Sequence, residues 1–97
     1  MEQKHAAQIL HALGHNARLE LFRLLVQAGD GGLNIGQIGK HLSMPPSTLA
    51  HHITTLVKAN VITQHQNGRE TINIANFKLV ESMASYLFND CCQGVEA

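Results

Sequence analysis

Apolar residues recur at helical spacing through the first part of the chain, and glycines separate the repeats. One repeat spans Ala6–Leu13 and ends at Gly14; the next begins at Asn16, which we expect to cap it, and stops in the glycine-rich segment 29–32. The apolar positions are Ala6, Ile9, Leu10 and Leu13 in the first repeat and Leu19, Phe22, Leu25 and Val26 in the second. The pattern predicts two amphipathic helices, each with one face turned toward a core.

A short helix followed closely by a longer one is predicted for residues 34–59. Asn34, with Gln37 three residues later, is typical of a capping box that opens the short helix. The residues expected on its buried side are Ile35, Ile38 and Leu42. Pro45 and Pro46 can begin a helix but cannot lie inside one, so we expect the longer helix to run from about Pro46 to Ala59.

The longer helix has two chemically distinct faces. At about 100° per residue, Leu49, Ile53 and Leu56 fall together on one face. The opposite face contains Ser47, Thr48, His51, Thr54, Thr55 and Lys58. This second face therefore presents hydrogen-bonding groups and a cation but no carboxylate.

A hairpin and a final helix are predicted for the rest of the chain. Val61–Ile62 begins a strand, Asn67–Gly68 is typical of a two-residue hairpin turn, and Ile72 and Ile74 alternate on the return strand. Asn76 can cap a last helix. The apolar stripe of that helix consists of Leu79, Val80, Met83, Ala84 and Leu87.

This order of elements predicts one domain over residues 1–97, mainly α-helical with a β-hairpin. A short helix, a tight turn and a second helix with an exposed polar face form a helix-turn-helix, and the hairpin after it corresponds to a wing. A short tail with Cys91 and Cys92 follows the last helix. The predicted fold is therefore a winged helix-turn-helix.

Three separated motifs resemble the ArsR/SmtB winged-helix repressors. They are residues 12–22 (ALGHNARLELF), residues 47–56 (STLAHHITTL) and Gly68–Arg69 in the hairpin, and the likeness extends from about Ala6 to Leu87. The resemblance implies a homodimer formed by the first and last helices, and operator DNA that is released when an inducer binds. It also implies that the second helix of the helix-turn-helix enters the major groove.

The same resemblance identifies the expected DNA contacts. It implies that Ser47, Thr48 and His51 face the groove and that Arg69 is the wing contact. Ala50 stands where the family often has Ser, so no base contact is expected from that side chain. Lys40 and Lys58 are expected to contact phosphates, which position a protein without reading sequence. The alternative for the whole polar face is a solvated helix surface with no partner.

The charge distribution agrees with a nucleic-acid partner although the total charge is zero. Seven Lys and Arg balance seven Asp and Glu. Residues 31–69 contain Lys40, Lys58 and Arg69 and no acid, whereas residues 70–97 contain four acids against one base. A polyanion would therefore meet the middle of the chain.

The adjacent cysteines are the candidate inducer site. A trans peptide holds neighbouring Cα atoms about 3.8 Å apart, which is short for a disulfide, so we expect free thiols and a cytoplasmic protein. Some arsenic-responsive relatives carry a cysteine pair near the C-terminus, and the resemblance therefore implies that Cys91 and Cys92 bind trivalent arsenic or another thiophilic inducer. The two sulfurs can converge on one atom only if the helix unwinds there. Because arsenite favours three sulfurs, a third would come from the dimer partner, or a monosubstituted arsenical would accept two.

Other functions are weighed against this one. No obligatory cofactor is expected, and redox sensing, ligand-independent DNA binding and an incidental cysteine pair stay open. His11 and His15 have a spacing that suits zinc, but Gly14 interrupts their helix, and packing or polar roles are favoured for the histidines. His52 lies at the edge of the apolar face, so packing or a backbone hydrogen bond is expected of it. No phosphate loop, nucleophile elbow or HExxH motif occurs, and no apolar stretch approaches about 20 residues, so neither an enzyme nor a membrane partner is expected.

Overall fold

The structure, a computed structural model, describes residues 1–97 and has the predicted order of elements. The helices are α1 (Gln3–Leu13), α2 (Asn16–Ala28), the 3₁₀ helix η1 (Gly29–Gly31), α3 (Ile35–Leu42), α4 (Pro46–Lys58) and α5 (Phe77–Leu87). The antiparallel strands are β1 (Ile62–Asn67) and β2 (Glu70–Ala75). The predicted winged helix-turn-helix fold is confirmed.

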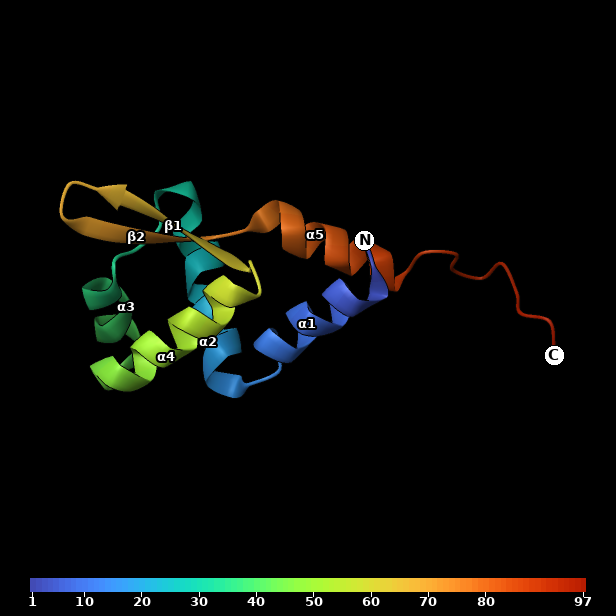
Figure 1. The fold of residues 1–97 in the computed structure, drawn as a ribbon, viewed down its shortest axis with the longest axis horizontal. Helices are drawn as coiled ribbons and strands as arrows, with labels where there is room; N and C mark the ends of the chain where they lie inside the picture. Colours follow the sequence, from blue (N-terminus) through green and yellow to red (C-terminus); the bar gives the residue numbers. More distant parts are fainter.

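The molecule is elongated, with extents of 55 × 23 × 20 Å. The hairpin tip, α3 and the start of α4 lie at one end, and α5 lies beside α1 at the other (Figure 1). The residues after α5 extend away from the helices (Figure 1). The helix-turn-helix with its wing and the α1–α5 surface are therefore at opposite ends of the chain.

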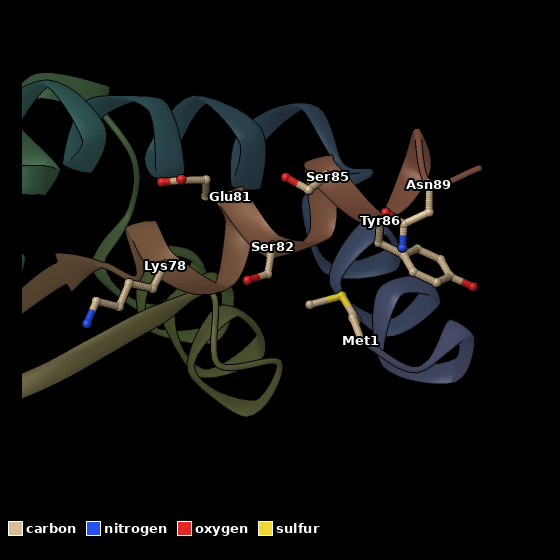
Figure 2. A pocket seen from close by; sticks show the side chains of 7 residues that line it. All are labelled: Met1, Lys78, Glu81, Ser82, Ser85, Tyr86 and Asn89. Atoms are coloured by element: carbon tan, nitrogen blue, oxygen red, sulfur yellow. The ribbon is translucent and has the colours of Figure 1, made fainter. Parts of the chain in front are cut away.

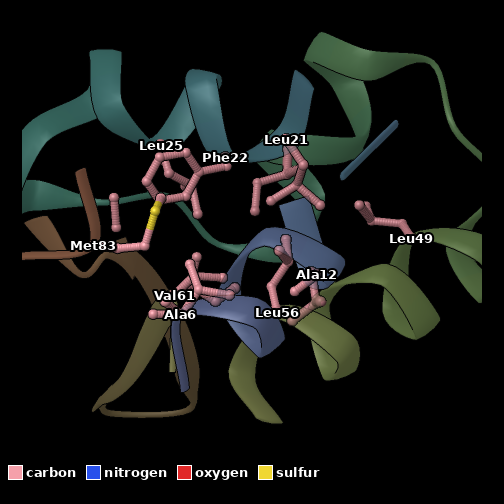
Figure 3. Close-up of a cluster of buried hydrophobic side chains, with 14 residues drawn as sticks. Ala6, Ala12, Leu21, Phe22, Leu25, Leu49, Leu56, Val61 and Met83 are labelled. Carbon is pink, nitrogen blue, oxygen red and sulfur yellow. The ribbon is translucent and has the colours of Figure 1, made fainter. Parts of the chain in front are cut away.

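The core connects these two ends. Fourteen buried apolar residues form one cluster, to which all the α-helices and both strands contribute (Figure 3). Leu21 and Leu25 of α2 are fully buried in it, and Met83 of α5 reaches toward Phe22 (Figure 3). Because a fully buried Leu or Ile contributes about 1.5–3 kcal/mol, this cluster fixes the position of α4 relative to α1 and α2.

Two details of the predicted helices are wrong. Asn16 does not cap α2: His15 does, and its Nδ1 accepts a hydrogen bond from the Ala17 N–H at 3.1 Å. Leu19, predicted to be in the apolar stripe, is 46% exposed, whereas Leu21 is fully buried. The reason is that α2 contacts α1, α4 and β2, so residues outside the predicted apolar stripe are also buried. A single stripe would be expected only of a helix that packs on one side.

The capping box of α3 is confirmed, but the burial of its first residue is not. Asn34 Oδ1 accepts from the Gln37 N–H at 2.8 Å, and Gln37 Oε1 accepts from the Asn34 N–H at 2.9 Å. Ile38 is fully buried against α4, but Ile35 is 45% exposed. Ile35 begins the helix and lies on the side that faces the wing, where no helix covers it.

The hairpin is shifted by one residue from the prediction. Asn67 pairs with Glu70, so the two-residue loop is Gly68–Arg69 and not Asn67–Gly68. Gly68 has φ +66°, and Arg69 does not have positive φ, which is the pattern of a type II′ turn with glycine first. The shift places Arg69 in the loop itself, at the tip of the wing.

The buried face of β2 is also different from the prediction. Asn73 and Ala75 are buried, whereas Ile72 and Ile74 are half-buried and lie over Gly32. Asn73 can be buried because both polar atoms of its side chain have a partner: Nδ2 donates to the Leu33 carbonyl at 3.2 Å and Oδ1 accepts from Gln64 Nε2 at 2.9 Å.

The last helix is capped as predicted but only partly covered. Asn76 Oδ1 accepts from the Leu79 N–H at 3.3 Å. Met83 is buried, but Ala84 and Leu87 of the predicted stripe are exposed. Apolar surface therefore remains uncovered on α5 in a single chain.

Candidate nucleic-acid interface

The turn between α3 and α4 presents the start of α4 to solvent. Ser43 ends α3 in the left-handed conformation, with φ 50° and ψ 44°. Pro45 is the N-cap of α4 and Pro46 is its first residue, where a missing N–H costs nothing. The first turn of α4 is consequently exposed, apart from Leu49, which anchors it to the core.

The polar face of α4 lies where the sequence places it. Leu49, Ile53 and Leu56 are buried. The exposed residues of the predicted set are Ser47, Thr48, His51, Thr54 and Lys58, and Thr55 is half-buried. The structure therefore brings the predicted groove-facing residues onto one continuous surface that has no carboxylate on α4.

The hydroxyl groups on this face differ in their availability. The Thr54 hydroxyl donates to the Ala50 carbonyl at 3.0 Å, and the Thr55 hydroxyl donates to the His51 carbonyl at 3.1 Å. Their hydrogens are used within the helix, so these two oxygens can only accept. Ser47 and Thr48 make no such bond, and their hydroxyls can both donate and accept.

The other predicted residues lie around this face. Arg69 borders a groove of about 530 Å³ between the wing and the helix-turn-helix, together with Thr54. Thr55 and Lys58 lie on the opposite flank, where they line a hollow of about 280 Å³ beside His11 of α1. Lys40 is exposed in the last turn of α3 and lines a mainly apolar hollow with Met44 and Leu49. Each of the three cations therefore lines a different hollow that α4 also borders.

One histidine of α4 faces inward. His52 is only 6% exposed, and its ring centroid lies 4.8 Å from that of His15 and 5.9 Å from that of His51. Its Nδ1 has no hydrogen-bond partner. Burial, with the nearby charges of His15, Arg18 and His51, lowers the pKa of His52. The expected packing role is confirmed.

Arg18 is a structural residue that the sequence reasoning missed. Its Nε donates to the Ala12 carbonyl at 2.6 Å and its Nη2 donates to the His11 carbonyl at 3.4 Å. It therefore satisfies the last carbonyls of α1 and orients that helix beside His52. The local signal was the cation four residues after Gly14, but its target could not be read from the pattern.

The cysteine pair lies beyond α5, in the tail. Cys91 and Cys92 are exposed and free, and their Sγ atoms are 3.1 Å apart. Asp90 and Cys92 have φ of 64° and 66°, so the chain is unwound at this point, as convergence of the two sulfurs requires. The hydrogen bond with Cys92 raises the pKa of the Cys91 thiol. No group of three or more His, Cys, Asp or Glu is arranged to hold a metal ion.

A polar hollow of about 440 Å³ lies on α5, at the far end from the wing. It is lined by Met1, Lys78, Glu81, Ser82, Ser85, Tyr86 and Asn89 (Figure 2). Leu87 and Phe88, which lie between the lining residues Tyr86 and Asn89, are 54% and 72% exposed, and Leu10 of α1 is 43% exposed. This end of the molecule therefore combines a hollow with large apolar side chains in contact with solvent. None of the helices is long and apolar enough to cross a membrane.

Comparisons with known proteins agree with this description. The model of a helix-turn-helix domain family matches residues 3–65. An uncharacterized HTH-type transcriptional regulator of Methanocaldococcus jannaschii is 32% identical over 63 residues, which are 65% of this chain and 68% of that protein.

Solved structures share the fold. An ArsR-like transcriptional regulator from Rhodococcus superimposes with a TM-score of 0.78 at 20% identity, over 87% of this chain and 76% of the other. The transcriptional repressor PagR of Bacillus anthracis gives 0.73 at 26% identity, over 87% and 93%. The homodimeric winged helix-turn-helix DNA-binding domain of a possible ArsR-family regulator from Mycobacterium bovis gives 0.72 at 15% identity, over 97% and 88%.

Proposed function

Since the chain belongs to the helix-turn-helix domain family, we propose that it is a dimeric DNA-binding transcriptional repressor that a thiol-reactive inducer releases from its operator. The observation that carries the proposal is the exposed face of α4, which has no acid and is flanked by Arg69 on the wing. The named relatives are transcriptional regulators, and the expectation that the chain is not an enzyme is confirmed.

The geometry of α4 suits the major groove. That groove is about 12 Å wide and admits an α-helix. Ser47, Thr48 and His51 occupy the exposed first half of α4, where hydroxyl and imidazole groups can reach base edges or phosphates. Lys58 and Arg69 flank them and would contact phosphates on either side. The free thiols of Cys91 and Cys92 support a cytoplasmic location for the proposed function.

The uncovered α1–α5 surface supports a homodimer. Leu10, Leu87 and Phe88 expose apolar area that a second copy would bury. Two copies double the number of cations and present two copies of α4. In dimeric helix-turn-helix proteins these helices lie about 34–36 Å apart, one turn of DNA, so we expect an inverted-repeat operator.

The proposed inducer site is the cysteine pair. A monosubstituted trivalent arsenical, R–As(OH)₂, would exchange its two hydroxyls for the Sγ atoms of Cys91 and Cys92. Two As–S bonds form, and the thiol protons leave with the hydroxyls as two water molecules, with no change of oxidation state. The 3.1 Å separation of the sulfurs and the unwound tail support this reaction. Arsenite itself would need a third sulfur from the partner.

Redox sensing is the second candidate for the same pair. It would require oxidation of both thiols to a bond between adjacent residues. The raised pKa of Cys91 reduces the thiolate fraction on which oxidation depends, whereas a bound arsenic atom would itself stabilise the deprotonated sulfurs.

Selection from a random duplex library tests DNA binding. The purified chain should enrich inverted repeats, and His51→Ala should weaken binding to the selected duplex about tenfold, in the range of one base contact. Gln27→Ala, at an exposed position of α2, is the control and should bind like the wild type. Failure to enrich any sequence would contradict the proposal.

Titration of the selected complex tests the inducer. Arsenite, an organoarsenical, Cd²⁺ and peroxide are added in turn to the wild type and to Cys91→Ser and Cys92→Ser. We expect the organoarsenical to release the wild type but neither variant. Release by peroxide alone would favour the redox alternative, and an unchanged response in both variants would exclude the cysteine pair as the inducer site.

A further inference from the structure

Asn34 connects the helix-turn-helix to the wing. Its Oδ1 accepts the Gln37 N–H in the capping box of α3, while its Nδ2 donates to Glu70 Oε1 at 2.6 Å. Ser, Thr or Asp could cap the helix equally well, so the cap requires only the oxygen. The amide nitrogen has a separate partner, 36 residues away and adjacent to Arg69.

We propose that Asn34 is a positioning residue: its hydrogen bond to Glu70 holds the wing tip so that Arg69 meets the DNA backbone. The proposal rests on the proposed DNA-binding function. It assigns Glu70 a role as well, because an acid next to the wing contact would otherwise oppose binding.

The base of the wing is held by other bonds. Leu33 and Asn73 exchange two backbone hydrogen bonds, of 3.0 and 2.8 Å, and the buried Asn73 side chain bonds to Gln64 and to Leu33. Glu70, the first residue of β2, lies three residues before Asn73 and roughly 10 Å closer to the wing tip, at about 3.3 Å per residue. An isolated two-stranded hairpin is marginally stable in water, so a bond from α3 to its outer end restricts the tip.

The tether also controls where the Glu70 charge lies. The carboxylate accepts from a neutral amide on the α3 side of the groove, the groove that Arg69 also lines. Without this donor, the carboxylate would be free to turn toward Arg69 or toward the DNA phosphates. The first arrangement would neutralise the wing cation, and the second would repel the DNA.

Two variants separate the tether from the cap. Asn34→Asp keeps the capping oxygen but places a second carboxylate against Glu70, which breaks the tether. The double variant Asn34→Asp/Glu70→Gln restores the hydrogen bond with donor and acceptor exchanged, since the amide introduced at position 70 can donate to the carboxylate introduced at position 34. Glu70→Gln alone keeps the acceptor that Asn34 uses and is the matched control.

The readout is the effect of Arg69→Ala in each background, measured as the change in Kd for the selected duplex. We expect Arg69→Ala to weaken binding roughly fivefold in the wild type and in Glu70→Gln, in the range of one charge-assisted contact. In Asn34→Asp the effect should fall below about twofold, and it should recover in the double variant. The same loss in all four backgrounds would overturn the proposal, because a purely structural role of Asn34 would not change the contribution of Arg69.

A second measurement needs no DNA. Backbone ¹⁵N relaxation of Gly68 and Arg69 should report greater mobility in Asn34→Asp and wild-type mobility in the double variant. Unchanged wing dynamics in Asn34→Asp would overturn the tether even if no duplex binds. A wild type that binds no duplex while its wing loosens as expected would instead contradict the proposed function alone.

Discussion

Replacing Gly32 by alanine should detach the wing from the helices. Gly32 has φ 61° and ψ −169°, a region that is essentially restricted to glycine. A Cβ added there would lie 2.4 Å from the Asn73 carbonyl oxygen and 2.7 Å from side-chain carbons of both Ile72 and Ile74. The nearest of these atoms belongs to the backbone of the Leu33–Asn73 bridge, so the strand itself must move.

The size of the effect follows from these contacts. Backbone strain of this kind costs about 1–3 kcal/mol, and each of the two bridge hydrogen bonds contributes about 1 kcal/mol. We therefore expect Gly32→Ala to lower the free energy of unfolding by about 3–5 kcal/mol. For a domain of this size that corresponds to a fall in Tm of more than about 10 °C.

The neighbouring glycine supplies the control. A Cβ at Gly31 would meet nothing within 4 Å, so Gly31→Ala should change the stability by less than about 1 kcal/mol. Urea unfolding followed by circular dichroism measures both variants under identical conditions. Equal stability of Gly31→Ala and Gly32→Ala would refute the close packing of Gly32 under β2.

Three further predictions concern α4 and α5. Burial, and then the charges of His15, Arg18 and His51, hold the pKa of His52 below its usual value of 6.5, so the unfolded chain binds more protons than the folded chain below that pH. Urea titrations should therefore show that the free energy of unfolding falls as the pH drops from about 6.5. The fall should be smaller in His52→Leu. Thr48→Val should weaken binding to the selected duplex about fivefold and Thr54→Val less than twofold, measured by fluorescence anisotropy, since the Thr54 hydroxyl hydrogen is already used within α4. Leu87→Glu should convert the proposed dimer to a monomer in sedimentation velocity, and a wild-type sedimentation coefficient would place the dimer contact elsewhere.

The sequence predicted the features that local patterns determine. Helical periodicity gave the order of elements and the two faces of α4, and the Asn34–Gln37 spacing gave the capping box. These features depend on residues within a few positions of each other. They agree with the structure, whereas two other local predictions, the Asn16 cap and the Asn67–Gly68 turn, are each wrong by one residue.

The larger differences between prediction and structure depend on residues far apart in the chain. Leu21 is buried because α2 contacts elements on several sides, and a single apolar stripe does not describe a helix with several neighbours. Asn73 is buried because Gln64 and Leu33 satisfy its side chain, from nine and 40 residues away. The Asn34–Glu70 bond also spans 36 residues and leaves no local signal.

The salt dependence of DNA affinity tests the central claim most directly. A dimer that brings Lys40, Lys58 and Arg69 of each chain to phosphates would make six such contacts, and log K should then fall against log salt concentration with a slope of roughly −5. Lys58→Gln should make this slope less negative by roughly 2, since it removes one phosphate contact from each chain of the dimer. A slope near zero would contradict the proposed DNA face. So would a slope that stays the same when Lys40, Lys58 or Arg69 is replaced by a neutral residue.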